Sequence, residues 1–452
     1  MSPFLRLTLL FRSVALCLVC ATLVMVNVHA QPITYPGLRV VGRQLYTPCN
    51  DKVVLRGVNK MIVWTSDLAL RKQSYVEIRK SGANCVRIVW LVQPGQYEVD
   101  AGVDGLDRTI QDCIDNDMIP MIELHDATGQ WSKLQMILDY WKRPDVVAVI
   151  KKHEKYLIVN IANECGEYEV TDEMFKSGYE SALTQLRSAG IHTPLVIDAA
   201  DWGKNLEQLV RVGSYLIDKD PDKNVMFSVH MYWSKNDGAD ANYITSQMQS
   251  AVNVGLPFMI GEFAGLFNRG GACTYEADYE TMIQRAQEME VGYLPWEWGP
   301  GNETAHPTCT VMNMTTNNYY NTLQAGWATA IVLTSPNSIK NTSITPQYIV
   351  DGGMCTPSSV DEIASNIADV TIAPNPFSES ARITVCTPRD GNLRITIVNV
   401  FGEAVAVVCD EYTLRGRRDI TLNIPYDVSG GALFCCVESN GSRVLRQIQI
   451  IR

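Results

Sequence analysis

Two apolar segments of this chain end abruptly in a glutamate, and this pattern limits the folds that the chain can adopt. Residues 156–162 are apolar and β-branched apart from Asn160, and Asn163 and Glu164 follow them directly. Such a run is typical of a strand that is buried on both faces. Residues 256–263 repeat the design and deliver Glu262. Because burying an unused carboxyl group costs free energy, we expect both glutamates to serve one site.

A glutamate after a strand can also cap the next helix or form a surface ion pair, and for either segment alone this alternative stays open. The rest of the chain favours the functional interpretation, because strand and helix patterns alternate eight times. The predicted core strands are 53–58, 84–90, 118–126, 156–162, 194–198, 225–233, 256–263 and 291–298. The predicted helices are 66–81, 104–117, helical segments up to 153, 172–189, 241–254, 275–289 and 319–332, and a small hairpin (38–45 and 52–55) precedes them.

Eight such units predict an α/β fold, the (β/α)₈ TIM barrel, which typically takes about 250 residues. A doubly wound parallel sheet is the competing architecture. It does not account for the eightfold count, and the chain lacks the Gly-x-Gly-x-x-Gly phosphate loop of that fold. We therefore expect a barrel.

The two ends of the chain differ in composition and in the pattern of apolar residues from the segment that is predicted to form the barrel. Residues 1–30 resemble a signal peptide, with Arg6 and Arg12 before an apolar core and Val-His-Ala before Gln31. An uncleaved anchor is the alternative, but the apolar core is short for a membrane span. The barrel domain is then 31–352. We expect a polar linker at 353–368 and a small all-β sandwich at 369–452, where short alternating runs are separated by Gly, Pro and Asp.

Charge and cysteine content narrow the function classes. The net charge of −11 and the pI of about 5.1 argue against nucleic acid and anionic membranes as partners, and a neutral polymer fits them better. Export permits disulfides, yet the mature chain has no Cys-x-x-Cys pair with metal spacing. Cys85 and Cys113 lie in apolar contexts typical of core thiols. Cys273 and Cys309 lie in loops and are the best disulfide candidates.

In a TIM barrel, residues at the C-terminal ends of different strands converge on one pocket. Two carboxylates there can divide the work, one as general acid and the other as an ionised nucleophile. A neighbouring arginine lowers a carboxyl pKa by about 1–3 units, a tyrosine can donate to the carboxylate, and tryptophans offer flat faces to a sugar ring. The candidates at or near the strand ends are Arg87, His125, Asn163, Glu164, Trp202, His230, Tyr232, Glu262, Trp296 and Trp298.

Each candidate also has a structural interpretation, which is strongest for the two histidines. His125 and His230 could hold loops, donate protons or bind a metal. No Asp/His set has obvious metal spacing, so we expect neither a metal nor another cofactor. A Gly-x-Ser-x-Gly elbow for an esterase is also missing.

Several of these segments resemble glycoside hydrolase family 5 (clan A), and within it the bacterial β-mannanase branch. The resemblance rests on segments 55–59 (Leu-Arg-Gly-Val-Asn), 84–88, 122–129 (with His-Asp-Ala-Thr-Gly), 160–164, 196–203, 227–232, 260–263 and 295–298 (Pro-Trp-Glu-Trp). It implies a retaining mechanism with Glu164 as acid/base and Glu262 as nucleophile. It also implies that Arg87, His125, Asn163, His230, Tyr232 and Trp296 occupy active-site positions.

The chain departs from this branch in places that would shape sugar subsites. The branch usually has a tryptophan after the acid/base glutamate, where this chain has Cys165-Gly166, and the segments 267–272 and 300–314 also differ. These differences bear on the choice of backbone sugar and leave the reaction type unchanged. The segments 373–377 (Ala-Pro-Asn-Pro-Phe), 397–402 and 444–452 resemble a C-terminal sorting domain of the type IX secretion system. A carbohydrate-binding sandwich is the alternative for this domain.

The leading hypothesis is a bacterial, secreted or cell-surface, retaining endo-β-1,4-glycanase that acts as a monomer on β-mannan or glucomannan. An endo-glucanase (cellulase) acting on β-glucan is the first alternative. A non-catalytic glycan-binding protein is the second, although both carboxylates are present. The secretion machinery would be the partner of the C-terminal domain.

Overall fold

The computed structural model describes residues 35–93, 95, 99–269, 271–302, 306–355, 369–387, 390–399, 403–423, 431–439 and 442–451. Its main body is an eight-stranded parallel sheet in the order β13-β10-β9-β8-β7-β6-β5-β4. A parallel bridge between Arg56 and Tyr293 joins the two outer strands and closes the barrel. The strands are β4 (Gly57–Lys60), β5 (Cys85–Trp90), β6 (Ile119–Leu124), β7 (Ile158–Asn160), β8 (Leu195–Asp198), β9 (Val225–His230), β10 (Phe258–Glu262) and β13 (Gly292–Tyr293).

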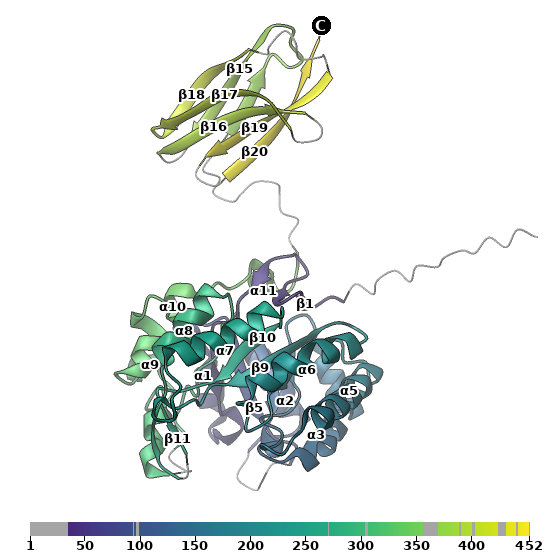
Figure 1. Ribbon diagram of the computed structural model, residues 1–452, viewed down its shortest axis with the longest axis vertical. Helices are drawn as coiled ribbons and strands as arrows, with labels where there is room; N and C mark the ends of the chain where they lie inside the picture. Colours follow the sequence, from purple (N-terminus) through teal and green to yellow (C-terminus); the bar gives the residue numbers. More distant parts are fainter. Residues whose placement is uncertain are drawn as a thin grey trace, which may run out of the picture.

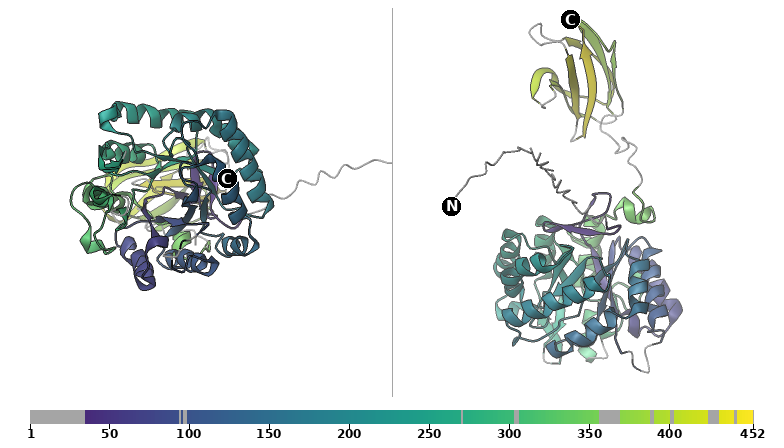
Figure 2. Two further views of the ribbon diagram at one scale, coloured as in Figure 1. Left: turned by 90° about the horizontal axis from the view of Figure 1, so that it is seen from below. Right: turned by 90° about the vertical axis from the view of Figure 1, so that its right-hand side faces the viewer.

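Helices surround this sheet on the outside (Figures 1 and 2). Their apolar faces and the outer faces of the strands form one large core, so each strand is buried on both sides, as its sequence predicts. The principal helices are α1 (Leu68–Arg79), α2 (Val103–Ile114), α3 (Leu134–Trp141), α4 (Pro144–Lys152), α5 (Asp172–Ser188), α6 (Leu206–Lys219), α7 (Ala241–Asn253) and α8 (Tyr279–Glu288). The short helices α9 (Trp327–Thr329), α10 (Ile339–Thr342) and α11 (Gln347–Val350) follow.

A small antiparallel sheet closes the N-terminal end of the barrel. It consists of β1 (Arg39–Val41), β2 (Gln44–Tyr46) and β3 (Lys52–Val53). Leu38, Leu45 and Val53 from this segment pack against apolar residues near the starts of the barrel strands, among them Ile158 and Val196. One end of the barrel is thus sealed by apolar contacts, and function is left to the other end.

Three predicted elements differ from the structure. The first core strand is β4, which begins at Gly57, because Lys52–Val53 pairs with β2 instead. The predicted helix 275–289 begins only at Tyr279, since Cys273–Glu276 (β12) forms a hairpin with Leu266–Asn268 (β11). The predicted helix 319–332 is broken into a short 3-10 turn, α9 and a π turn, and Gly326 has a φ of +87° just before α9. The sequence patterns also left α6 unpredicted.

The C-terminal region forms two antiparallel sheets with their own core. The strands are β14 (Asp369–Ala373), β15 (Ser380–Thr387), β16 (Gly391–Val398), β17 (Ala404–Thr413), β18 (Gly416–Asn423), β19 (Gly431–Ser439) and β20 (Ser442–Ile450). One sheet has the order β14-β15-β18 and the other β17-β16-β19-β20. Alternate residues such as Ile383, Val385, Leu393 and Ile395 fill the space between them. This is the small all-β sandwich that the sequence predicts.

Two disulfides lie within the described residues. Cys273–Cys309 confirms the pair that the sequence favoured. Cys49–Cys355 was not predicted, and it joins the loop after β2 to the segment beyond α11. Residues 353–355, which the sequence assigned to the linker, are therefore fastened to the barrel. Cys85 and Cys113 are buried free thiols, as predicted.

The predicted signal peptide (1–30) and residues 356–368 of the predicted linker lie outside the described residues. Among the helices that the structure does describe, none combines the length and the apolar character that crossing a bilayer would need.

Candidate active site

Along the barrel strands, the side chains that point inward change from apolar to polar between one inward position and the next, two residues further on. Residues i and i+2 of a strand share a face. The apolar layer that meets the N-terminal sheet includes Cys85, Met121, Ile158, Val196 and Met226. Two positions further along the same strands the chain has Arg87, Glu123, Asn160, Asp198 and Ser228. A polar layer is therefore built directly on top of an apolar one.

Arg87 lies at the centre of this polar layer and is fully buried. Its Nη1 atom lies 2.6 Å from Oε1 of Glu262, and its Nη2 atom donates to Oδ1 of Asn163 at 2.7 Å. Nε donates to Oδ1 of Asn160 at 2.8 Å. Burial opposes its charge, but the surrounding carboxylates, Glu123 and Glu262 first, raise the pKa of Arg87 above its usual value. The guanidinium is thus a fixed positive charge, and the carboxylates and amides around it are oriented by its planar set of donors.

Glu262 ends β10 and is almost completely buried. Besides Arg87, it accepts a hydrogen bond from Oη of Tyr232 to its Oε2 atom at 2.9 Å. Burial raises the pKa of Glu262, and the positive charges of His230 and Arg87 counteract that rise. Burial and the charge of Glu262 raise the pKa of Tyr232 well above its usual value, so the phenol keeps its proton and donates it. Both Glu262 oxygens are therefore held by donors.

Glu164 follows β7 and has a φ of +43°, in the left-handed region. The turn is held by the Glu164 backbone N–H, which donates to Oδ2 of Asp198 at 3.1 Å, and by its carbonyl, which accepts from the N–H of Gly129 at 2.9 Å. A side chain in this region costs free energy that the surrounding structure must supply, and such residues cluster at functional sites. The turn directs the carboxyl group toward the barrel axis.

His230 lies close to both glutamates. Its Nδ1 atom lies 2.8 Å from Oε1 of Glu164 and 3.6 Å from Oε1 of Glu262, and its Nε2 atom lies 3.4 Å from Oδ2 of Asp198. Complete burial opposes protonation, but the charges of Glu262 and Asp198 and the hydrogen bond to Glu164 raise the pKa of His230 to about 9. The ring nitrogen Nδ1 is therefore within hydrogen-bonding distance of Glu164.

The two carboxyl groups are close together. One oxygen of Glu164, one of Glu262 and a ring nitrogen of His230 all lie within 4.8 Å of one another. Such a triad has the geometry to hold a metal ion, but the ring nitrogen near the carboxylates already faces Glu164, and Arg87 supplies a cation beside Glu262. Such a close approach of one oxygen from each carboxyl group is compatible with a retaining glycosidase, whose carboxyl groups lie about 5–5.5 Å apart, closer than the roughly 6.5–9.5 Å of an inverting one.

A cavity of about 1260 Å³ opens over these carboxylates. Its walls come from the loops that follow the barrel strands, as expected for the C-terminal end of a TIM barrel. Trp296 stacks on His125 with ring centroids 5.8 Å apart and an interplanar angle of 22°. The predicted residues that line the cavity are His125, Asn163, Glu164, Trp202, Tyr232, Glu262 and Trp296. A space of this size with aromatic walls and two carboxylates suits a segment of a polysaccharide.

Comparison with known proteins decides the family. The model of the cellulase family, glycosyl hydrolase family 5, matches residues 48–302. The chain belongs to glycosyl hydrolase family 5. It is therefore a glycoside hydrolase, and the seven predicted residues at the cavity lie at the C-terminal end of the barrel, where TIM-barrel enzymes have their active sites.

The relatives of this family 5 chain include curated mannanases. It is 34% identical over 271 residues to a mannan endo-1,4-beta-mannosidase of Salipaludibacillus agaradhaerens, which covers 59% of this chain and 83% of the relative. It is 31% identical over 313 residues to the enzyme of the same name from Cellvibrio japonicus, with 68% of each chain covered. The crystal structure of a β-mannanase from Thermomonospora fusca superposes with a TM-score of 0.61 at 29% identity, over 69% of this chain and 99% of that one.

Three of the predicted substrate-binding residues of the family 5 domain do not line the cavity. Trp298 is fully buried, and its indole N–H donates to the carbonyl of Asn318 at 2.8 Å, so it is a core residue that does not reach the cavity. Arg87 and His230 are also fully buried and lie behind the carboxylates. They contact the glutamates instead of the cavity. Both residues belong to the barrel strands, whereas the cavity walls come from the loops that follow the strands.

Four polar residues of the site were not predicted as site residues: Asn59, Glu123, Asn160 and Asp198. Asp198 contacts Arg87, Asn160 and the Glu164 backbone, and Glu123 Oε1 lies 2.9 Å from Nδ1 of His125. The signal was present in the sequence for Glu123, Asn160 and Asp198, because each follows an inward apolar residue by two positions. Cys165, one of the departures from the mannanase branch, is buried against the carbonyl of Gln130 and does not line the cavity.

Proposed function

We propose that this family 5 enzyme is a retaining endo-β-1,4-mannanase that uses Glu262 as nucleophile and Glu164 as acid/base. The observation that carries the retaining assignment is the close approach of the two carboxyl groups, within 4.8 Å for one oxygen of each. A close pair favours the retaining mechanism, because an inverting enzyme separates its carboxyl groups to place a water molecule opposite the leaving group.

The two glutamates differ in their donors, and this difference assigns their roles. Glu262 faces Arg87 and Tyr232, whose donors favour an anionic oxygen ready to attack. Glu164 faces only His230 among these groups and points into the same cavity. Glu262 attacks the anomeric carbon and the glycosidic C–O bond breaks, while Glu164 gives its proton to the departing oxygen. Glu164 then takes a proton from water, which attacks the same carbon and releases Glu262.

The remaining cavity residues bind the sugar. The Asn163 amide is oriented at both ends, because its Oδ1 accepts from Arg87 and its Nδ2 donates to Oγ1 of Thr128 at 2.8 Å. It is placed to bond a hydroxyl beside the reacting carbon. Trp296 and Trp202 offer apolar faces to sugar rings, and 39% of Trp202 is exposed.

Mannan is favoured over glucan by the relatives. The curated proteins cited above are named mannanases, and a related solved structure of 28% identity is a mannohexaose complex of the Thermomonospora fusca β-mannanase. A relative from Caldicellulosiruptor saccharolyticus, 29% identical, is named beta-mannanase/endoglucanase A, which keeps cellulase activity as the second candidate.

A substrate panel tests this proposal. The purified protein is incubated with glucomannan, galactomannan, carboxymethyl-cellulose and xylan, and reducing ends and polymer viscosity are followed. We expect the highest kcat/KM on the mannans and a fall in viscosity ahead of complete sugar release. Preference for carboxymethyl-cellulose would overturn the mannan assignment, and no release from any glycan would overturn the enzymatic one.

We also propose that the protein is exported and that the C-terminal sandwich is a type IX sorting domain. The signal-like residues 1–30 and the motifs of residues 373–377 and 444–452 support this assignment, and the two disulfides are typical of an oxidising compartment. The test is cell fractionation of a type IX-competent bacterium that expresses the full chain or a chain ending at 368. Surface delivery of both forms alike would overturn the sorting role.

A further inference from the structure

The indole of Trp296 is held in place by a single hydrogen bond at its edge. Its Nε1 atom donates to Oδ1 of Asn302 at 2.8 Å, and both residues line the cavity. On its other side the ring stacks on His125. Because stacking alone does not fix where the edge of the ring lies, the bond to Asn302 supplies the contact that holds the indole edge in one place.

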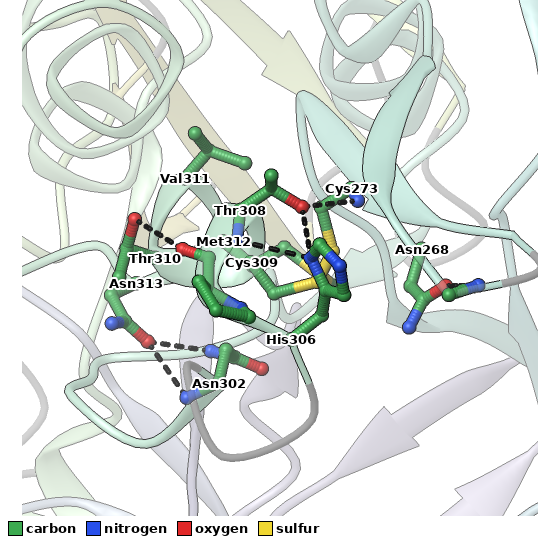
Figure 3. The surroundings of a disulfide bond; sticks show 12 residues. Asn268, Cys273, Asn302, His306, Thr308, Cys309, Thr310, Val311, Met312 and Asn313 are labelled. Carbon is green, nitrogen blue, oxygen red and sulfur yellow. Dashed lines mark hydrogen bonds between the residues drawn. A yellow bond between two sulfur atoms is a disulfide. The ribbon is translucent and has the colours of Figure 1, made fainter.

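Asn302 is in turn held by Asn313. The backbone N–H and the Nδ2 atom of Asn302 both donate to Oδ1 of Asn313, at 3.2 Å and 2.7 Å (Figure 3). With its amide nitrogen engaged in this way, the Asn302 oxygen must point to Trp296. Both asparagines are at least nine-tenths buried, so each lost bond would leave a polar group without water to replace the partner.

Asn313 directly follows a 3-10 segment, Pro307–Met312, that the Cys273–Cys309 disulfide joins to β12. Two further contacts reinforce this junction. The backbone N–H of Cys273 donates to Oγ1 of Thr308 at 3.0 Å, and Sγ of Cys273 lies 3.3 Å from Sδ of Met312 (Figure 3). The anchor of Asn302 therefore follows a segment that is covalently attached to the β11–β12 hairpin, which also lines the cavity.

We propose that Asn302 is a positioning residue for Trp296 and that the Cys273–Cys309 disulfide, acting through Asn313, fixes Asn302. The effect on turnover rests on the proposed function, whereas the effect on the Trp296 ring does not. A misplaced platform matters because an error of about 1 Å in substrate position can cost a large factor in rate.

The first experiment is a double-mutant cycle on kcat/KM, measured with whichever β-glycan the wild type cleaves best. Asn302→Ala should lower kcat/KM about tenfold, the equivalent of one hydrogen bond. Trp296→Phe removes the indole N–H, so adding Asn302→Ala to it should cost almost nothing more. Asn253→Ala on the exposed end of α7 is the control and should match the wild type. Fully additive losses would mean that Asn302 does not act through Trp296.

The second experiment needs no substrate. The protein is labelled with 5-fluorotryptophan, and the Trp296 fluorine resonance is assigned as the one that disappears in Trp296→Phe. We expect this resonance to shift in Asn302→Ala, in Asn313→Ala and in the double variant Cys273→Ser/Cys309→Ser. The double variant Cys49→Ser/Cys355→Ser removes the disulfide at the opposite end of the barrel. In this variant the Trp296 resonance should keep its wild-type position.

The outcomes separate the two proposals. If the wild type cleaves no glycan but the resonance shifts as described, the proposed function fails and the positioning role stands. An unchanged resonance in Asn302→Ala would overturn the positioning role whatever the activity. If the Cys273→Ser/Cys309→Ser variant does not fold, Asn313→Ala keeps the disulfide and tests the same chain of contacts. A resonance that moves equally in the Cys49→Ser/Cys355→Ser control would overturn the part assigned to the Cys273–Cys309 disulfide.

Discussion

Nη1 of Arg87 lies 2.6 Å from Oε1 of Glu262, and both side chains are almost completely removed from solvent. An ion pair in this setting gains little net stability, because taking both charges out of water is costly. Removing one partner, however, leaves the other charge buried and unpaired. The pair is therefore better understood as a device that orients the nucleophile, with Tyr232 on its second oxygen, than as a source of stability.

We expect Glu262→Ala to reduce hydrolysis by at least about 10⁴-fold with the fold retained, since the covalent intermediate requires this carboxylate. Initial rates on mannan and the circular dichroism spectrum measure the two properties. Glu280→Ala, an exposed carboxylate on α8, is the matched control. Wild-type turnover in the Glu262 variant would contradict the assignment of the nucleophile.

Glu164→Ala should lose most activity on polymers but retain much of it on aryl glycosides with good leaving groups. Protonation of the departing oxygen matters little for such substrates, because the leaving group departs as a stable anion. The measurement compares kcat/KM for an activated and an unactivated glycoside. An equal loss on both would exclude Glu164 as the general acid.

Arg87→Ala should destabilise the barrel by about 3–5 kcal/mol, because it leaves buried carboxylates without their cation. Arg87→Lys restores a charge, but one ammonium group cannot replace the donors that reach Glu262, Asn163 and Asn160 together. We therefore expect the lysine variant to be more stable than the alanine variant and still nearly inactive. Urea unfolding and mannan hydrolysis check the two expectations, and full activity in the lysine variant would contradict the orienting role.

The free energy of unfolding should depend on pH through the protonation of His230. The folded state raises its pKa from 6.5 to about 9, so the folded protein binds this proton more tightly than the unfolded chain. The stabilisation is complete below pH 6.5, on the order of 3 kcal/mol, and is lost as the pH rises toward 9. His125, whose pKa is also raised by Glu123 against the effect of burial, acts in the same direction.

Melting temperatures between pH 6 and 9.5 test this expectation. The wild type should lose stability over that range, and His230→Gln should lose less. His192→Gln, at a surface histidine paired with Asp222, should follow the wild type. A wild-type melting temperature that stays constant over the range would show that the His230 proton is not bound more tightly in the folded state.

Lys60 and Glu297 form a second buried pair, with Nζ 3.8 Å from Oε2 and neither side chain exposed. Lys60 also donates to the carbonyl of Gly299, and Glu297 accepts from the N–H of Met61. Lys60→Met alone should cost about 3–5 kcal/mol, whereas Lys60→Met/Glu297→Leu should recover most of that loss. Unfolding free energies of both variants measure the difference. A double variant as unstable as the single one would show that backbone contacts, and not the unpaired charge, cause the loss.

How far the sequence predicts this molecule depends on whether a residue's neighbours are local. The barrel strands, both glutamates and the cavity tryptophan Trp296 follow from apolar runs and from the position of each residue at a strand end. Trp298 has the same pattern as Trp296 at a spacing of two residues, yet it is fully buried, and its indole N–H donates to the carbonyl of Asn318, a partner 20 residues along the chain. Asp198 was passed over because it reads as an ordinary strand end, and its role depends on Arg87 from a strand far away in the sequence.

The Cys49–Cys355 disulfide spans a sequence separation of 306 residues and encloses every strand of the barrel. A protease that cuts one surface loop between these cysteines produces two fragments that remain a single covalent molecule. The cut chain can therefore hold its barrel together and keep its site assembled where a linear chain would separate. On a denaturing gel such a nicked enzyme migrates as one band until a reductant is added, and only then as two.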